Sequence, residues 1–195
     1  MTQCKHFDIC HLEATETRPD EDSFCILHSR NEEKDESRFR EALSFHHQQS
    51  SGTYRHFVFP KSIISLQTWF GNQRSGRRLD FSNARFLGNV KFTGFEFNGG
   101  VSFLDSIFEG DTEFRQCIFG GMTDFTRAHF CRNAEFRRAQ FQTPVSFMDA
   151  LFEGDAVFTL ATFNRAVFLR TKFLKGVSYS EGIFCDEVHF INSEV

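Results

Sequence analysis

Residues 81–125 read FSNARFLGNVKFTGFEFNGGVSFLDSIFEGDTEFRQCIFGGMTDF, in which phenylalanine recurs at steps of five and six residues in near-perfect alternation. The same steps continue to residue 190, with a tyrosine in place of one phenylalanine. A fixed repeat of this kind constrains the whole fold before any helix or strand is assigned. We therefore treat residues 81–190 as one repetitive structure and the remaining residues as attachments to it.

The residue two places before each aromatic residue is usually small or slender. Ala84 and Val90 are examples, and Phe95 is the bulky exception. Side chains two residues apart share one face of a strand, as they do not in a helix. The pattern predicts very short strands separated by corners. Glycines two residues after an aromatic residue, such as Gly110 and Gly154, are predicted to make the corners because glycine accepts a positive φ.

Four corners close one coil, so two units of eleven residues predict coils of twenty-two residues. One residue is missing between Phe163 and Phe168, and each column of aromatic residues is expected to shift once there. The predicted columns are Phe81, Phe103, Phe125, Phe147, Phe168 and Phe190; Phe86, Phe108, Phe130, Phe152, Phe173 and Val195; Phe92, Phe114, Phe136, Phe158 and Tyr179; and Phe97, Phe119, Phe141, Phe163 and Phe184.

The same steps can be extended towards the amino terminus. Phe59, Ile64, Phe70 and Ser75 precede Phe81 at intervals of five, six, five and six residues. We therefore predict a first coil over residues 59–80, with Phe59 at the start of the Phe81 column. In this coil, Thr68 and Leu79 are expected in the inward position before the aromatic residue.

The repeat resembles that of the pentapeptide-repeat family, whose units read small, polar, Leu or Phe, and two variable residues. The resemblance covers roughly residues 59–195. It implies an all-β solenoid, a right-handed quadrilateral β-helix of about six coils with the aromatic and small residues inside. The extra residue in alternate units departs from the family pattern and predicts bulged corners. Because the family has no shared active site, the resemblance assigns no functional residue.

The chain length of 195 residues fits one domain with a small appendage. We predict a zinc-binding segment over residues 1–28, a capping helix and linker over 29–52, and the β-helix over 53–195. The helix is predicted from Ser29 to about His47, with Ser29 or Asn31 as its N-cap and Phe39, Leu43 and His46 among the residues on its apolar face. It is expected to cover the first coil, because a solenoid must shield its terminal layer.

Residues 1–28 contain Cys4, Cys10, Cys25 and His28 in the spacing C-x5-C-x14-C-x2-H, with His6 and His11 nearby as spare imidazoles. Three thiolates and one imidazole complete a tetrahedral structural zinc site. A metal would also supply folding energy to a segment with few apolar residues. A disordered tail with reduced cysteines is the alternative, and a disulfide framework is less favoured. A catalytic zinc is disfavoured because four protein ligands leave no open position.

The formal net charge of the chain is −4, and no apolar run approaches the roughly 20 residues that span a bilayer. No membrane-spanning helix is therefore expected. The amino terminus, MTQCKHFDIC, lacks the apolar region of a secretory signal, which predicts a cytoplasmic protein.

Several outward positions near the first two columns are apolar where solvent favours polar residues. Stacked coils would gather them into a patch, which usually marks a contact surface. We therefore predict a non-enzymatic scaffold that binds a protein partner, whose identity the sequence does not give. The predicted partner-binding residues are Leu104, Ile107, Met148, Leu151, Val167, Leu169 and Leu174.

Three other functions are less favoured. One branch of the family mimics DNA and protects DNA gyrase, a type II topoisomerase, but here the acidic residues alternate with arginines such as Arg127 and Arg170. Nucleic-acid binding through the zinc segment and the arginines of residues 74–78 rests on a weak basic cluster. An enzyme is disfavoured because the carboxylate pairs at residues 109/111 and 153/155 have no evident histidine partner.

The carboxyl-terminal coil is predicted to form a homodimer. Tyr179, Phe184 and Phe190 belong to the last coil, and no further helix follows them in the sequence. An uncovered coil exposes apolar rings and unpaired strand edges. Two chains that meet end to end across a two-fold axis would cover each other. The alternative is that the natural protein continues beyond Val195 and covers this coil itself.

Overall fold

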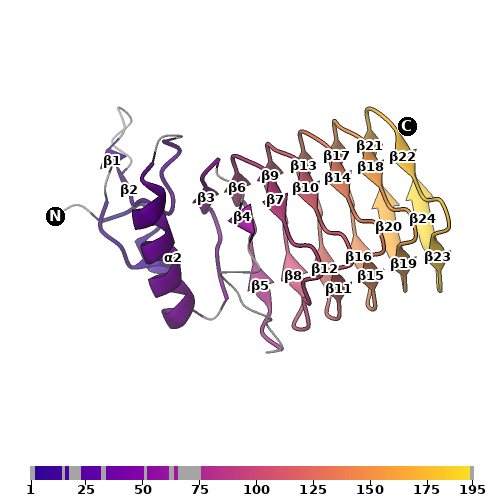
Figure 1. The fold of residues 1–195 in the computed structure, drawn as a ribbon, viewed down its shortest axis with the longest axis horizontal. Helices are drawn as coiled ribbons and strands as arrows, with labels where there is room; N and C mark the ends of the chain where they lie inside the picture. Colours follow the sequence, from indigo (N-terminus) through magenta and orange to yellow (C-terminus); the bar gives the residue numbers. More distant parts are fainter. Residues whose placement is uncertain are drawn as a thin grey trace.

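The computed structural model describes residues 3–14, 16–17, 23–31, 34–50, 52–61, 64–65 and 76–193. Short strands follow one another around a stack of coils, and a helix lies across the amino-terminal end (Figure 1). Every strand pair within the stack is parallel. The protein is a parallel β-solenoid with a helical cap, as the sequence predicts.

The stack has four sides, each made of one strand per coil. In the described residues, three sides carry six strands and the fourth carries four, which amounts to about five complete turns. A separate antiparallel pair, β1 (Glu16–Thr17) and β2 (Ser23–Phe24), lies in the amino-terminal segment.

The strands of the four sides follow in chain order. The first side holds β5 (Leu79–Asp80), β8 (Val101–Ser102), β12 (Thr123–Asp124), β16 (Val145–Ser146), β20 (Ala166–Leu169) and β24 (Val188–Ile191). The second side holds β3 (Val58–Phe59), β6 (Arg85–Phe86), β9 (Ile107–Phe108), β13 (His129–Phe130), β17 (Leu151–Phe152) and β21 (Lys172–Phe173). The third side holds β4 (Ile64–Ser65), β7 (Val90–Lys91), β10 (Thr112–Glu113), β14 (Ala134–Glu135), β18 (Ala156–Val157) and β22 (Val177–Ser178). The fourth side holds β11 (Ile118–Phe119), β15 (Gln140–Phe141), β19 (Thr162–Phe163) and β23 (Ile183–Phe184).

The described aromatic residues stack in the four predicted columns. Rings in successive coils are nearly parallel, with centroids 4.5 Å apart at the closest pair, Phe119 and Phe141, and 5.3 Å apart between Phe163 and Phe184. The missing residue shortens the register from 22 to 21 positions, as in the pairing of Leu151 with Lys172. The columns therefore continue across it, as predicted. Val195 lies outside the described residues.

The core is a solid of phenylalanine rings and small side chains. Most rings between Phe81 and Phe168 are fully buried, and so are the alanines two residues before them. Where the residue two places before the ring is polar, its hydroxyl donates to a backbone carbonyl. Ser106 donates to the carbonyl of Phe103 and Thr171 to that of Phe147, both at 2.8 Å. Phe95, the bulky exception, is accommodated inside and packs on Phe97 with a centroid distance of 4.6 Å.

The prediction for the first coil is wrong in register. Phe59 stacks on Phe86 rather than Phe81, at a centroid distance of 4.6 Å, and Tyr54 takes the place above Phe81 at 5.0 Å. The structure therefore places 27 positions between Phe59 and the ring below it, where the regular coils place 22. The added residues break the periodicity that the extension assumed.

Other parts of the first-coil prediction have different outcomes. Leu79 is buried and pairs with Val101, which confirms its inward position. Thr68, Phe70 and Ser75 lie outside the described residues.

The reason predicted for the corner glycines, a positive φ, is also wrong. In the regular coils, the residues with positive φ other than Gly100 stand two places after the first and third columns, in the shorter steps. Apart from Gly94 they are not glycine: Asn83, Asp105, Gln116, Arg127, Arg138, Asp149, Leu160, Arg170, Glu181 and Asn192. Gly110 and Gly154 have no positive φ. They are required because coils approach closely: a Cβ on Gly110 would lie 2.4 Å from the carbonyl carbon of Gly88.

Polar side chains tie successive corners together. In each case a side-chain Oδ1 atom accepts a hydrogen bond from a backbone N–H one coil further on, at 2.9 to 3.2 Å. The acceptor and donor residues are Asn89 and Asp111, Asp111 and Asn133, Asn133 and Asp155, and Asp155 and Gly176. This ladder gives two of the carboxylates, Asp111 and Asp155, a structural role.

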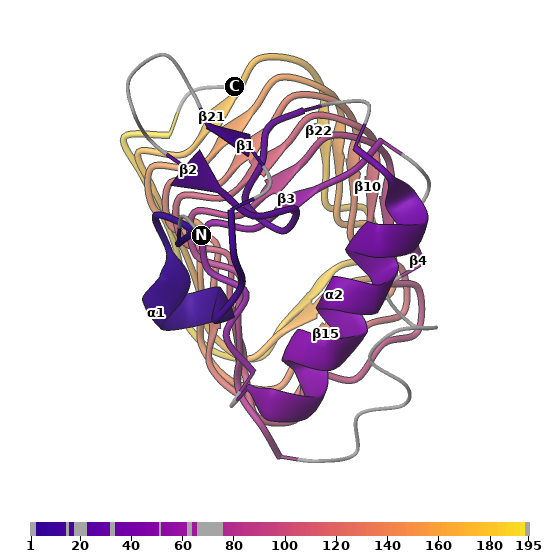
Figure 2. The same cartoon turned by 90° about the vertical axis from the view of Figure 1, so that its left-hand side faces the viewer.

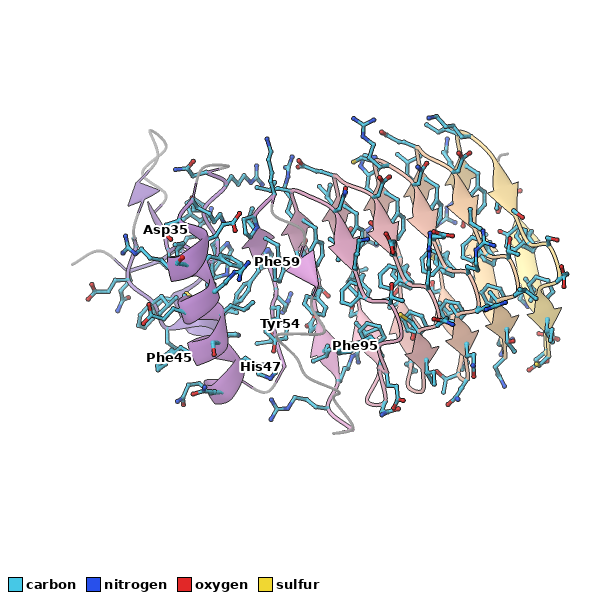
Figure 3. All side chains as sticks on the ribbon, in the orientation of Figure 1. Asp35, Phe45, His47, Tyr54, Phe59 and Phe95 are labelled. Atoms are coloured by element: carbon cyan, nitrogen blue, oxygen red, sulfur yellow. The ribbon has the colours of Figure 1, made fainter. Side chains whose placement is uncertain are left out.

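Helix α2 covers the first coil, as predicted. It spans Glu36–Gln49 and buries Phe39, Leu43 and His46, with Phe39 against Phe59 at a centroid distance of 5.8 Å. Figure 2 shows α2 across the end of the stack, and Figure 3 shows Tyr54 and Phe59 between the helix and the next coil. Within the described residues, neither helix is long and apolar enough to cross a membrane.

The predicted N-cap of α2 is wrong. Asp35 is the N-cap, and its side chain accepts the backbone N–H of Arg38 at 3.1 Å. The Ser29 hydroxyl instead accepts the backbone N–H of Asn31 at 3.0 Å and so closes a turn before the helix.

We predict that Gly110→Ala destabilises the solenoid. The new Cβ would overlap the backbone of residues 88 and 89, and overpacking of this kind costs about 1 to 3 kcal/mol. A lower urea midpoint for unfolding measures the effect. Gly76→Ala is the matched control, because nothing lies within 4 Å of its Cβ. Equal midpoints for the two variants would contradict the steric explanation.

Candidate metal centre

Two short structures bring the four predicted ligands together. Helix α1 (Phe7–Cys10) ends at Cys10, and its first residue donates its N–H to the carbonyl of Cys4 at 2.9 Å. A turn then carries Cys25 and His28, with the Cys25 carbonyl accepting the N–H of His28 at 3.0 Å. The four ligand atoms lie within 4.8 Å of one another, and all four residues are buried.

The distances between the ligand atoms fit a tetrahedral zinc ion. His28 Nδ1 lies 3.5 Å from Cys4 Sγ and 3.3 Å from Cys25 Sγ, and the sulfurs of Cys25 and Cys10 are 3.6 Å apart. Ligands at about 2.0 to 2.3 Å from a tetrahedral zinc are separated by about 3.3 to 3.8 Å. The donor set of three sulfurs and one nitrogen also suits zinc.

The surroundings of His28 orient its ring towards the sulfurs. Its Nε2 atom lies 3.4 Å from the carbonyl oxygen of Arg55, so that Nδ1 faces the three cysteines. The ring also packs edge-on against Phe57 at a centroid distance of 4.9 Å. A backbone acceptor on the outer nitrogen is the usual support for a metal-binding imidazole.

The three thiols perturb one another strongly. Hydrogen bonds from Cys10 and Cys25 hold the pKa of Cys4 far below its ordinary value. The pKa of Cys10 is raised, first because it shares a hydrogen bond with Cys25. A zinc ion would bind all three cysteines as thiolates, so that their protons would be released on binding.

The centre is packed into the same core as the solenoid. Cys4, Cys10 and Cys25 belong to the hydrophobic cluster that continues into the phenylalanine columns. The Leu27 carbonyl, next to His28, accepts the N–H of Val58 in β3 at 2.8 Å. The cap is therefore joined to the first coil at the turn that carries Cys25 and His28.

Lys34 is a structural residue that the sequence analysis missed. It is buried, and its ammonium group donates to the carbonyls of Ser29 and Val58 at 2.6 and 2.7 Å. It also lies over the ring of Phe39, 5.1 Å from the centroid. A lone lysine before a helix gives no sequence signal of burial, because lysine is rarely buried unless paired.

The distances between the sulfurs bear on the alternatives for the cysteines. The Cys10 and Cys25 sulfurs are separated by 3.6 Å, far beyond the roughly 2.05 Å of a disulfide, and the described cysteines are free.

His6 stacks on His56 and faces His28, and burial lowers the pKa of His6 to about 4. With four buried protein ligands, the arrangement suits a structural metal rather than a catalytic one.

A model of pentapeptide repeats in nine copies matches residues 76–118, 105–150 and 136–181, which together cover more than half of the chain. The chain belongs to the pentapeptide-repeat family. No curated protein matches the chain. The match begins at residue 76, so the candidate metal ligands lie outside the matched repeats.

The predicted partner-binding residues are less exposed than their sequence positions indicate. Leu174 is 60% exposed, whereas the other six are half-buried. On the second side, the polar residue His129 separates Ile107 from Leu151. The residues at this position in successive coils are Arg85, Ile107, His129, Leu151 and Lys172. The seven predicted residues therefore do not all belong to one continuous apolar surface.

The predicted dimerisation residues lie where exposed apolar side chains concentrate. Phe184 and Phe190 are 41% and 49% exposed, while Tyr179 is half-buried. Five of the seven exposed large hydrophobic residues in the described chain belong to the last coil: Leu174, Ile183, Phe184, Phe190 and Ile191. The rings of the earlier coils are covered on both faces.

Charged residues on the solenoid form pairs across neighbouring coils. Arg127 binds Asp105, and Arg170 binds Asp149, each through two contacts of 2.6 Å. Lys91 lies 3.0 Å from Glu113. Further pairs between coils are Arg85 with Glu109, Arg115 with Glu135, and Arg165 with Glu187. Arg137 binds the same Glu135 within its own coil. This pattern does not form the continuous acidic stripe that a DNA mimic requires.

Glu153 has a histidine partner, contrary to the expectation for the carboxylate pairs. His129 Nε2 lies 2.9 Å from its Oε1 atom. Spacing alone does not reveal this contact, because the two residues are 24 positions apart. In the predicted basic cluster, Arg77 donates to the carbonyl of Ser50, and Arg74 lies outside the described residues.

We predict that the buried centre retains one zinc ion per chain through dialysis against metal-free buffer, measured by elemental analysis. Cys25→Ser should lose this ion and lower the thermal midpoint, because the site is continuous with the core of the first coil. Cys185→Ser, at an exposed cysteine, is the control and should change neither value. Protein prepared without chelator that contains no metal, with its thiols free, would refute the assignment.

Proposed function

We propose that the protein is a non-enzymatic scaffold that binds another protein through the sides of its solenoid. Pentapeptide-repeat proteins are generally interaction scaffolds, and their solenoid is typically non-catalytic. The observation that supports the proposal most is the regular display of outward side chains on a fully packed core, with strands about 4.8 Å apart. Such a surface is extended, rigid and already ordered before binding, which lowers the entropy cost of association.

The partner surface that we favour lies near the carboxyl-terminal half of the first side. Leu169 pairs with Ile191 across neighbouring coils, and Ile191 is 48% exposed. Met148 precedes Leu169 in the same column, because the Asp149 N–H donates to the Leu169 carbonyl. This apolar strip is bordered by the Asp149–Arg170 ion pair. A protein surface with an apolar ridge and a mixed-charge rim matches it.

The metal centre has a structural role in this proposal. Zinc would fix the turn of residues 25–28 against β3 and so hold the cap on the first coil. We place the protein in the cytoplasm, because free thiols that bind a metal persist in a reducing compartment.

We further propose that the last coil pairs with the last coil of a second copy. The exposed rings of Phe184 and Phe190 stack on Phe163 and Phe168, and they end their columns within the described residues. A second copy presents the same rings and the same strand edges, so that a two-fold contact covers both ends at once.

The side-binding proposal predicts that Leu151→Lys with Leu169→Lys abolishes partner capture while preserving the fold. The two half-buried leucines lie on adjoining sides, and two ammonium groups there would oppose an apolar contact. Tagged protein recovered from the native cell, followed by quantitative mass spectrometry, measures capture.

The matched control for this test is Gln140→Lys with Gln142→Lys. Both glutamines are exposed on or beside β15 of the fourth side, opposite the second side in chain order. The control adds the same charge and should leave capture unchanged. Equal capture by the leucine variant and the wild type would rule out this surface.

The end-to-end proposal predicts that the wild-type chain is a dimer and that Phe190→Glu is a monomer at micromolar concentration. A carboxylate in the ring column would be buried without a partner in the dimer. Light scattering measures the mass. Met122→Glu, at a 71% exposed site in the middle of the stack, is the control and should remain dimeric. A monomeric wild type, or a Phe190→Glu dimer of unchanged affinity, would rule out this interface.

A further inference from the structure

A second group of metal-ligating side chains lies on the second side of the solenoid. His129 is in β13, Cys131 follows this strand, and Glu153 follows β17 in the next coil. One ligand atom from each lies within 4.8 Å of the other two. His129 Nε2 is 2.9 Å from Glu153 Oε1 and 3.7 Å from Cys131 Sγ. The three residues therefore converge on one point of the surface.

The backbone beneath this group is held rigidly. The N–H groups of His129, Cys131 and Glu153 donate to carbonyls of the preceding coil, each at 2.9 Å. Between His129 and Cys131, the buried ring of Phe130 stacks on Phe152 at a centroid distance of 4.6 Å. The ligand positions are fixed before any ion arrives, which is the property expected of a high-affinity site.

The outward residues of this coil on the second side differ from those at the equivalent positions of the neighbouring coils. His129 and Cys131 occupy the places that Ile107 and Glu109 hold in the preceding coil and Leu151 and Glu153 hold in the following one. Within the described part of the second side, no other rung combines an imidazole with a thiol. The neighbouring Glu109 binds Arg85, which leaves Glu153 as the carboxylate that faces the histidine.

We propose that His129, Cys131 and Glu153 form a surface site for a divalent transition-metal ion, with Zn²⁺ as the first candidate. A thiolate, an imidazole and a carboxylate are all ordinary zinc ligands. Three protein ligands leave a fourth position for water, in contrast to the closed set of four at the cap. The side chains are half-exposed, so an ion can enter from solvent without opening the fold.

The contact that an ion would displace is weak. His129 and Glu153 retain 32% and 43% of their side-chain exposure, and a pair this exposed contributes little to stability. A metal would separate the imidazole nitrogen from the carboxylate by binding between them. Because the backbone positions stay fixed, only side-chain rotations are needed.

The test is a zinc titration of the full chain. Protein reduced without added thiols and dialysed against metal-free buffer is titrated with Zn²⁺ in competition with a chromophoric chelator. The wild type should bind one equivalent more than Cys131→Ser, and His129→Gln and Glu153→Gln should bind this equivalent at least about 10-fold more weakly. The comparison measures a difference of one equivalent, so it does not depend on the occupancy of the cap.

A control variant and a spectroscopic probe distinguish this site from nonspecific binding of zinc to exposed thiols. Cys185→Ser removes an exposed thiol outside the group and should retain the full number of equivalents. With Co²⁺ as the probe, the thiolate-to-metal absorption should fall in Cys131→Ser and remain unchanged in Cys185→Ser. The proposal is overturned if Cys131→Ser binds as many equivalents as the wild type with the same affinity, or if the two cysteine variants lose the same equivalent.

Discussion

The stacking of phenylalanine rings on the coil spacing is the interaction on which the rest of the structure depends. Parallel strands lie about 4.7 to 4.9 Å apart, and offset aromatic rings favour centroid distances that begin near 4.5 Å. In the described columns the ring centroids lie between 4.5 and 5.3 Å apart. One distance therefore satisfies the backbone hydrogen bonds and the ring contacts together. Small residues two places before each ring fill the remaining space, and glycine appears where two coils touch.

This double constraint explains how much of the fold was predictable. The columns, the strand faces and the shift at the missing residue follow from a period of two within strands and twenty-two between coils. The first coil was placed wrongly because Phe59 and Ile64 fall on the same arithmetic by coincidence. Tyr54, which takes the place above Phe81, lies outside that arithmetic. Periodicity predicts the regular coils. The register of a coil of different length beside the cap is set by its packing against the cap.

The clustering of the four candidate metal ligands was predictable for a different reason. Cysteine and histidine spacing reports a ligand set directly, and the structure brings Cys4, Cys10, Cys25 and His28 together. What the spacing could not report is the attachment of this set to the solenoid through Leu27, Lys34 and Phe57, because these contacts depend on tertiary structure. The same limit applies to His129 and Glu153. Their proximity becomes visible only after the register between coils is known.

The separation between core and surface has a consequence for function. In each unit the ring and the small residue are fixed by packing, whereas the outward positions contact solvent and neighbouring rungs. Residues far apart in sequence become neighbours when they occupy equivalent or adjoining outward positions in successive coils. Asp105 and Arg127 form an ion pair at equivalent positions, and His129 contacts Glu153 at an adjoining one. A solenoid can therefore acquire a binding surface or a metal site through a few outward substitutions without altering its core. Function in this protein should accordingly be sought along the columns of outward residues, read from coil to coil rather than along the chain.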